Sequence, residues 1–400
     1  MRVLFVNRFF HPDQSATAQL LTELAEDLDS FGMSVTVITG RVDYLGAGAL
    51  LPSRGMHKGI EIQRVRSTNF DRGGILGRLI DYLSFYVAAG WAVLRSRRCD
   101  VLVVLSDPPL LSVLAVVLGT LKRCRTVCWL QDVFPEIAVR AGVLPEGFAA
   151  RLLRRVATWS LRHVDRTVVI GRCMKRHLQA LGVPSEQLHL IPNWADTSHI
   201  QPVNRQENWF LEEHGLGQQF VVMYSGNFGV VHESETIRTL IRAAKSLEQI
   251  RFCFIGKGPH RDGLAESARL EGWDHVLFLP YQDREMMRFA LPSGDVHLVS
   301  LRSDMSGLSV PSKVYGIMAA GRPIIFVGPP ESEAAAAIRE ADCGHVIPPG
   351  RGQEAFEAML TYYRDRSLVE RHGRNARSYL VQGCDRRLLT GRFRDLLQVL

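Results

Sequence analysis

The sequence of 400 residues lacks the features that mark metal-binding, disulfide-linked and exported proteins. Its seven cysteines are odd in number and scattered, and Cys124 and Cys128 lack the second pair of ligands that a zinc site needs. We therefore expect reduced cysteines and no metal site. Reduced cysteines predict a cytoplasmic protein. The opening residues Met1–Val6 form a strand pattern instead of a charged lead, an apolar stretch and a cleavage site, so no export is expected.

The sequence also lacks a recognised nucleic-acid-binding motif, although its net charge is +7 and its pI is about 9.2. The basic residues gather in clusters such as Arg95–Arg98 and Arg151–Arg155. Such clusters suit anionic lipid headgroups or a phosphorylated substrate. We expect no nucleic-acid partner.

No apolar stretch is free of charge over a full membrane-spanning length. Residues 76–94 come close, but Arg78 and Asp81 fall in the first two turns of the predicted helix. This pattern favours either a buried helix or one that lies in a membrane interface. With the basic residues 95–98 after it, the helix predicts peripheral contact with an anionic membrane, on the inner face of the cell membrane.

What the sequence does contain is two consecutive series of alternating strands and helices. The order strand, helix, strand predicts parallel strands with right-handed crossovers and therefore an α/β fold. Residues 197–218 lose this periodicity and indicate a linker. We predict two doubly wound, Rossmann-like domains that face a cleft, over residues 1–200 and 201–380. Residues 381–400 are expected to form a helix that packs back on the first domain.

The most informative segment is 306–323, where a glycine-bearing loop leads into a short helix that Gly321 and Pro323 end. Apolar, strand-like runs precede and follow it. A helix N-terminus at the carboxyl end of a parallel strand attracts phosphate, and Ser312 and Lys313 lie beside it. The alternative is an ordinary connection of a doubly wound domain.

Several other side chains follow predicted strands, where ligands bind in such folds. Asp132 and Glu136 are candidates for acid–base chemistry, although Asp132 could instead cap the next helix. His232 could bind phosphate or could be a solvated loop residue. Tyr281 could contact a nucleotide base or could be a packing residue.

Five short motifs occur in an order that resembles one enzyme family. They are Gln131-Asp132, Pro192-Asn-Trp194, Tyr224-Ser-Gly-Asn227, Phe254-Ile-Gly-Lys-Gly-Pro-His-Arg261 and Val310-Pro-Ser-Lys-Val-Tyr-Gly-Ile-Met-Ala-Ala-Gly-Arg-Pro323. Together they resemble family-4 glycosyltransferases of the GT-B type, in the branch that builds bacterial surface polysaccharides such as colanic acid, O-antigen and capsule. The resemblance covers nearly the whole chain.

The resemblance implies a metal-independent, retaining transfer of a sugar from a nucleotide diphosphate sugar, with a UDP-sugar favoured and no cofactor. The acceptor would be a lipid-linked sugar or a polysaccharide bound by the N-terminal domain. The implied site residues are Asp132, Glu136 and His232 for catalysis; Gly226, Asn227, Gly229, Gly256, Lys257, Arg261, Tyr281, Leu308, Ser309, Ser312 and Lys313 for the donor; and Asn7, Ser15 and Ala16 for the acceptor.

The chain departs from the family pattern at positions that matter for the donor. The usual pair of glutamates falls on Leu308 and Gly316, and the usual Arg and Lys that clamp the diphosphate fall where Asn227 and His232 stand. Lys313 is expected to compensate. Two rival functions stay open, a UDP-sugar 2-epimerase of the same architecture and a nucleotide-sugar-binding partner that has lost catalysis.

Overall fold

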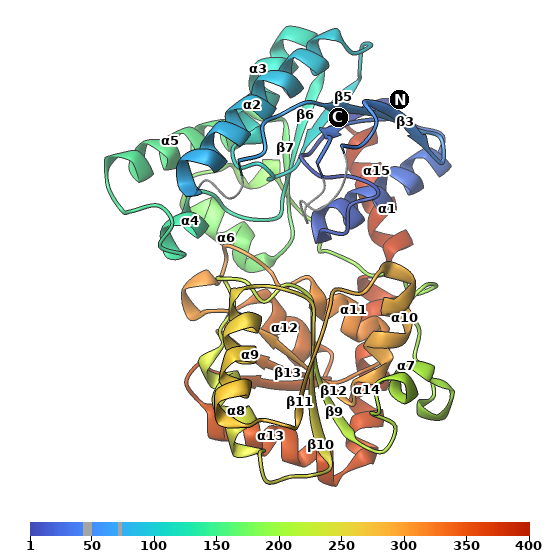
Figure 1. Cartoon of the computed structure of the whole chain (residues 1–400). Coiled ribbons are helices and arrows are strands. Elements are labelled where there is room, and N and C mark those ends of the chain that lie inside the picture. The colour runs from blue at the N-terminus through green and yellow to red at the C-terminus, as the bar shows by residue number, and fades with distance from the viewer. Residues whose placement is uncertain (43–49, 71–73) are drawn as a thin grey trace. The chain divides into compact units, whose positions relative to one another are not determined.

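The computed structural model describes residues 1–42, 50–70 and 74–400, which form two compact units. Unit 1 comprises Met1–Pro192, Gly307–Ser309 and Arg387–Leu400, and unit 2 comprises Asn193–Ser306 and Val310–Arg386. Each unit contains one mainly parallel sheet with helices packed on it (Figure 1). The predicted α/β fold class is confirmed for both.

Within its described residues, unit 1 has an eight-stranded sheet in the order β3-β4-β2-β1-β5-β6-β7-β8. All neighbouring pairs are parallel except β3 and β4, which are antiparallel. Strand β3, a short strand at the edge of the sheet, was not predicted from the sequence. The strands are β1 (Arg2–Val6), β2 (Ser34–Gly40), β3 (Arg54–His57), β4 (Ile60–Val65), β5 (Val101–Val104), β6 (Arg125–Leu130), β7 (Arg166–Val169) and β8 (Leu188–Leu190).

The helices of unit 1 include a group of three neighbours, in which α2 packs on α3 and α3 packs on α5 (Figure 1). A buried hydrogen bond of 2.7 Å between the Ser112 and Ser160 hydroxyls joins α3 to α5. Within the described residues, no helix combines the length and hydropathy needed to cross a membrane. The helices are α1 (Ala16–Ser30), α2 (Gly74–Arg95), α3 (Leu111–Lys122), α4 (Glu136–Arg140), α5 (Phe148–His163), α6 (Arg172–Ala180), the 3-10 turn Ser185–Gln187 and α15 (Arg386–Gln398).

Unit 2 has a parallel sheet of six strands in its described residues, in the order β11-β10-β9-β12-β13-β14. The strands are β9 (Phe220–Ser225), β10 (Ile250–Ile255), β11 (Val276–Leu279), β12 (Val296–Ser300), β13 (Ile324–Val327) and β14 (Gly344–Ile347). The helices are α7 (Trp209–Glu213), α8 (Glu235–Ala243), α9 (Pro259–Glu271), α10 (Arg284–Ser293), α11 (Lys313–Ala319), α12 (Glu333–Glu340), α13 (Gly352–Arg364) and α14 (Arg366–Gly383), with 3-10 turns at Arg205–Glu207 and Ser303–Met305.

Strand β9 shows why the predicted donor-binding residues of unit 2 lie in loops at the ends of the strands. Val222 and Tyr224 pack into a core with α8 and α13, whereas Val221 and Met223 pack into a second core with α7 and α10. Alternate side chains of a strand point to opposite faces, so both faces of the sheet are covered by helices. Polar side chains that contact ligands must therefore come from the loops at the strand ends.

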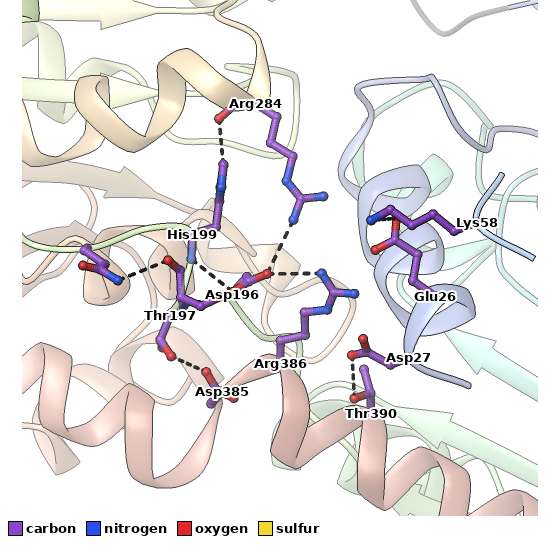
Figure 2. A network of polar contacts seen from close by, with 12 residues as sticks. Glu26, Asp27, Lys58, Asp196, Thr197, His199, Arg284, Asp385, Arg386 and Thr390 are labelled. Atoms are coloured by element: carbon purple, nitrogen blue, oxygen red, sulfur yellow. Dashed lines mark hydrogen bonds and ion pairs between the residues drawn. The ribbon is translucent and has the colours of Figure 1, made fainter. Parts of the chain in front are cut away.

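The division between the units differs from the predicted boundaries at residues 200 and 380. Ala195 forms a β-bridge with Asp385, and the Asp196 carboxylate accepts a hydrogen bond of 3.1 Å from Arg386 and lies 3.8 Å from Arg284 (Figure 2). These contacts place residues 193–200 and 381–386 in unit 2. Residues 387–400 belong to unit 1, where Thr390 donates a hydrogen bond of 2.9 Å to Asp27 (Figure 2).

One buried carboxylate supports the amino-terminal end of the unit 2 sheet and provides a test of this fold. The Asp295 side chain is 6% exposed and accepts hydrogen bonds from Arg205 (3.0 Å), Arg366 (2.6 Å) and the backbone N–H of Val221 (2.7 Å). Asp295→Ala leaves two guanidinium groups and one N–H without this acceptor. We expect the free energy of unfolding to fall by about 2–4 kcal/mol, measured by chemical denaturation.

The matched control is Glu266→Ala, because Glu266 forms an ion pair with Arg269 in which both side chains are more than half exposed. An exposed pair contributes about 0–1 kcal/mol. Equal losses from the two substitutions would show that Asp295 has no special role in the sheet.

Candidate functional site

In each sheet the order of the strands reverses between two central strands, so that the chain continues toward the opposite edge of the sheet. Ligands bind outside the carboxyl ends of the strands at such a point. In unit 2 this point lies between β9 and β12, which are neighbours in the sheet. The loop 226–232 follows β9 and the segment 301–312 follows β12. In unit 1 the corresponding strands are β1 and β5.

Two glycine-containing loops of unit 2 pack against each other through their backbones. Gly256 and Gly258 have φ values of +126° and +125°, and a Cβ atom on them would lie 2.4 Å from the Gly226 carbonyl oxygen and 2.6 Å from that of Phe228. A residue with a side chain is excluded at both positions. The Phe228 N–H also donates to the Lys257 carbonyl at 2.8 Å. The predicted donor residues Gly226, Asn227, Gly229, Gly256 and Lys257 therefore form one local structure.

Lys313 reaches this structure from the first residue of α11. Its ammonium group donates to the Tyr224 hydroxyl at 2.6 Å and to the Asn227 carbonyl at 3.1 Å, and it lies 4.0 Å from the centre of the Tyr224 ring. Burial lowers the pKa of Lys313 to about 7. Its two hydrogen-bond acceptors here are neutral, so the positive charge is poorly compensated in the empty protein.

His232 lies in the interior of unit 2, so the alternative of a solvated loop residue is wrong. The His232 side chain is 9% exposed, and its Nδ1 lies 2.6 Å from the Ser300 carbonyl oxygen. Burial holds the pKa of His232 well below its ordinary value, and the charge of Lys313 adds to this effect. A neutral ring that donates through Nδ1 has Nε2 as an acceptor, so it cannot donate to a phosphate oxygen there.

The other predicted donor residues of unit 2 lie around the same edge. Arg261 lies in the first turn of α9, pairs with Asp262 at 3.2 Å and stacks over the Phe278 ring at 5.3 Å. Ser312 immediately precedes α11, and its hydroxyl does not cap that helix. Tyr281 follows the edge strand β11, two strands away from β9. The structure thus brings Lys313 and loop 226–232 together and leaves Tyr281 at the edge of the sheet.

In unit 1, the predicted acceptor residues come from the loop that follows β1. Asn7 is fully buried, and its Nδ2 donates to the Phe9 carbonyl at 2.7 Å. Ser15 precedes α1, and its N–H donates to the Asp13 carboxylate at 2.7 Å. Ala16 begins α1 and is exposed. Asn7 therefore shapes the loop and the Ser15 hydroxyl is buried, whereas Ala16 is open to solvent.

Asp132 follows β6 and contacts the segment Gly307–Ser309, which belongs to unit 1. Asp132 and Ser309 form a β-bridge, and the Val133 N–H donates to the Leu308 carbonyl at 2.9 Å. Asp132 is exposed to solvent as a residue. The protein atoms around its carboxylate nevertheless desolvate this group and raise its pKa, and a hydrogen bond with Ser309 opposes the rise. The predicted donor residues Leu308 and Ser309 thus lie beside the predicted catalytic Asp132.

Glu136, the other predicted catalytic acid, forms a structural contact. It begins α4, is 8% exposed and accepts a hydrogen bond of 3.1 Å from Arg154 on α5. Arg154 also contacts Glu146 at 3.3 Å. This ion pair favours a role for Glu136 in holding α4 against α5 over a role in proton transfer.

Sequence reasoning missed Asp107, which follows β5, one of the two strands between which the strand order of unit 1 reverses. Its carbonyl accepts the Arg8 N–H at 2.9 Å. Burial raises the pKa of Asp107 to about 6; Arg8 opposes the rise, and the negative charges of Asp132 and Asp13 add to it. The sequence does contain a signal for Asp107, because this residue closely follows the apolar run that forms β5. Strand β5 pairs with β6, and β6 precedes Asp132.

The carboxylates of the described residues do not assemble into a metal site. No group of three or more His, Cys, Asp or Glu side chains in this part of the chain has an arrangement that could hold a metal ion.

The fold matches solved glycosyltransferase structures over the whole chain. It is similar to the crystal structure of Anabaena Alr3699/HepE in complex with UDP and glucose, with a TM-score of 0.77, 16% identity and 100% of both chains covered. It is also similar to WaaG, a glycosyltransferase involved in lipopolysaccharide biosynthesis, with a TM-score of 0.72, 17% identity and 99% of both chains covered. These likenesses define the GT-B class of fold.

The family follows from the sequence matches. Residues 16–194 match the Glycosyl transferase 4-like domain, and residues 219–365 match Glycosyl transferases group 1. The chain belongs to the glycosyltransferases that combine these two domains. It is 34% identical over 256 residues to the probable glycosyltransferase WbjE of Pseudomonas aeruginosa, a match that spans 64% of the length of each protein. It is 25% identical over 320 residues to the putative colanic acid biosynthesis glycosyl transferase WcaI of Escherichia coli, covering 78% of this chain and 77% of that protein.

The environment of Lys313 predicts a pH-dependent stability. Its pKa of about 7 in the folded protein lies below its ordinary value of 10.5. The unfolded chain therefore binds more protons between these values, and the free energy of unfolding rises with pH across that range. Lys313→Met removes the buried charge, so we expect a gain of about 1–2 kcal/mol at pH 6 that shrinks by pH 9.5, measured by chemical denaturation.

Lys257→Met is the matched control, because Lys257 lies in the same pair of loops but is exposed. Its effect on stability is expected to be the same at both pH values. Lys313→Met is also expected to weaken binding of a nucleoside diphosphate by roughly 1.5–3 kcal/mol. A loss of stability with unchanged affinity would make Lys313 a structural residue.

Proposed function

We propose that this chain is a retaining, metal-independent glycosyltransferase that moves a sugar from a nucleotide diphosphate sugar, with a UDP-sugar favoured, to a lipid-linked or polysaccharide acceptor. It would act on the cytoplasmic face of the membrane in the synthesis of a cell-surface glycan. The observation that carries the proposal is the poorly compensated charge of Lys313 at the carboxyl ends of β9 and β12.

The chemistry of transfer explains why this charge matters. Negative charge accumulates on the departing diphosphate in the transition state, and fixed positive groups stabilise it most strongly in a site of low dielectric. A bound diphosphate would favour the protonated form of Lys313. The Lys313 ammonium would then contribute to transition-state stabilisation without a metal ion.

The relatives support the donor and the type of pathway. The solved structures of HepE hold UDP and glucose or UDP-glucose, and WcaI is described as acting in colanic acid biosynthesis. From these we infer a nucleotide sugar as the donor and a surface glycan as the product of this chain.

Unit 1 supplies the groups that would act on the acceptor. Asp132 and Asp107 both follow central strands, and the negative charge of Asp132 contributes to the raised pKa of Asp107. Carboxylates bind sugar hydroxyl groups well, and one with a raised pKa can accept a proton from a hydroxyl. We assign Asp132 the role of orienting the acceptor hydroxyl and receiving or relaying its proton.

Incubation with a panel of nucleotide sugars tests the proposed activity. The expected result is slow hydrolysis of one donor, measured as release of the nucleoside diphosphate, and transfer to an added lipid-linked or glycan acceptor with retention of the anomeric configuration by NMR. No release from any donor with several acceptors would contradict the proposal.

Asp132→Asn tests the role of the carboxylate. We expect a fall in kcat of about 10²-fold, the usual scale of general acid–base catalysis, with the affinity for the nucleotide unchanged. Glu136→Gln is the control, because its contact with Arg154 predicts an effect on stability and little effect on kcat. A larger fall in kcat for Glu136→Gln would reverse the assignment.

A binding protein without catalysis remains the second candidate, favoured by the missing glutamates at Leu308 and Gly316. A Cβ atom on Gly316 would lie 3.3 Å from the Leu291 side chain, so a glutamate there would require Leu291 to move. Calorimetry that detects donor binding without turnover for any acceptor would favour this candidate. The third possibility is a 2-epimerase, which would change the configuration of the donor sugar without an acceptor. Analysis of the product sugar distinguishes it from a glycosyltransferase.

The outer face of α2 supports contact with a membrane. Leu83, Val87 and Trp91 recur at intervals of four residues and are 54%, 76% and 57% exposed. The opposite face, with Phe85 and Ala89, is buried. The same outer apolar character continues on the neighbouring helices, at Val117 and Leu121 of α3 and Phe148, Leu152 and Trp159 of α5. Exposed apolar side chains gathered on neighbouring helices fit an interaction site.

Basic residues border this apolar surface. Arg95, Arg97 and Arg98 are exposed at and after the end of α2, and Arg95 stacks on Trp91 at 4.4 Å. Arg151 and Arg155 are exposed on α5. An apolar face with basic flanks fits an interfacial helix on an anionic leaflet. Arg154, which the sequence assigned to the same group, is instead occupied by Glu136 and Glu146.

Co-sedimentation with vesicles tests this contact. The double variant Leu83→Glu/Val87→Glu places two charges in the apolar face, so we expect binding to vesicles with 30% anionic lipid to fall by about tenfold or more. The control is Val381→Glu on α14, where a single exposed valine (48%) is replaced. Wild-type protein that stays in the supernatant at low salt would refute membrane binding.

A further inference from the structure

Three basic residues of unit 2 lie outside the predicted set, and two of them, Arg302 and His260, contact loop 226–232, while the charge of the third, Arg238, acts on His260. Arg302 follows β12, His260 lies in the first turn of α9, and Arg238 lies on α8. They are widely separated in the sequence, and the adjacency of β9 with β10 and with β12 brings their elements together.

Arg302 is attached to this loop by two contacts. Its backbone N–H donates to the Val231 carbonyl at 3.0 Å, and its Nη1 donates to the Val230 carbonyl at 3.3 Å. Its Nη2 lies 2.7 Å from the Asp304 carboxylate, and about a third of each of these two side chains is exposed. The guanidinium is therefore held at the loop, with part of its surface accessible to solvent.

His260 is anchored to the same loop. Its backbone N–H donates to the Phe228 carbonyl at 3.1 Å, and its ring centre lies 5.5 Å from that of Phe228. Burial lowers the pKa of His260, and the charges of Arg302 and Arg238 lower it further, while Glu235 opposes them. These charged groups thus lie near enough to His260 to affect its protonation.

His232 connects this group to Lys313. The pKa of His232 is lowered first by burial, then by Lys313 and also by His260, against the opposing hydrogen bond to Ser300. The facing carboxylates compensate the positive charge in part. Asp304 pairs with Arg302, and Glu235, which is 74% exposed, lies 3.5 Å from Arg238.

Resting on the proposed function, we propose that Arg302 binds the β-phosphate of the nucleoside diphosphate, with His260 beside it. The resemblance implies a clamp of an Arg and a Lys at positions where this chain has Asn227 and His232. In this chain, a guanidinium on the β12 side of the same loop takes that role. Arginine presents two parallel N–H donors to a phosphate, which suits the dianionic end of the leaving group.

Asp304 provides a second test of this assignment, because its substitution should change the affinity for the diphosphate in the opposite direction to a substitution of Arg302. It occupies the Nη2 side of Arg302, so a phosphate must compete with it or share the guanidinium. Asp304→Asn removes the competing charge and the like-charge repulsion toward the phosphate. The substitution should therefore tighten binding, a direction that damage to the fold would not produce.

The experiment compares UDP with UMP by calorimetry on the full chain, because the two ligands differ in the β-phosphate. Arg302→Gln is expected to weaken UDP about 10- to 100-fold and UMP less than about threefold, and Arg302→Lys to restore part of the loss. Asp304→Asn is expected to tighten UDP about threefold. Arg269→Gln is the control, an exposed arginine paired with Glu266 on the same unit. Thermal melts establish that each variant is folded.

The outcomes separate this inference from the proposed function. If the wild-type chain binds UDP and Arg302→Gln does not change that affinity, or weakens UDP and UMP equally, the assignment of Arg302 to the β-phosphate is wrong and the glycosyltransferase proposal stands. If the wild-type chain binds none of UDP, GDP, ADP, CDP and dTDP, the proposed function fails and this inference fails with it.

Discussion

The arrangement of unit 2 depends on one constraint, which is that positive charge is held at the carboxyl ends of β9 and β12 without full compensation. Lys313 is bound by a phenol and a carbonyl. Burial lowers the pKa of both His232 and His260; the charge of Lys313 adds to this effect at His232, and the charges of Arg302 and Arg238 add to it at His260. Like charges brought together in a partly desolvated place raise the free energy of the empty protein. The surrounding structure must supply that free energy, and a bound anion would lower it.

The rigid elements that hold these charges are the two glycine loops and the two-sided core. Gly256 and Gly258 let the backbone of one loop lie against the other, and the alternate residues of β9 fill the cores on both faces. A strand fixed on both sides has little freedom to shift its register. The loop that follows it therefore keeps a defined position, and Arg302 and Lys313 can meet it from β12 and α11.

The sequence predicted the repeating elements well and the contacts between them poorly. The predicted alternation of strands and helices is present in both units, and strands such as β6 and β9 lie on continuous apolar runs bounded by polar residues, which are a strong local signal. Helix α12 and strand β14 were not predicted; the apolar residues of 333–340 are nearly all alanines, whose small side chains give a weak hydrophobic signal. Lys313 was found through its motif. Asp107 and Arg302 gain their significance from strands adjacent in the sheet but distant in sequence, and local patterns do not report such neighbours.

Helix α2 is a second case in which the sequence left the environment of an element undecided. Its sequence is apolar around most of its circumference, so periodicity alone allowed either a buried helix or one at an interface. The structure distinguishes the two faces, because Phe85 and Ala89 are buried and Leu83, Val87 and Trp91 are exposed. Asp81 supports this orientation, since its carboxylate is buried, accepts the Phe70 N–H at 2.9 Å and lies 4.0 Å from Arg8. Arg8 in turn follows β1, so the inner face of α2 contacts the loop that contains the predicted acceptor residues. The helix that would touch the lipid thus also helps to shape the place where a lipid-linked acceptor would bind.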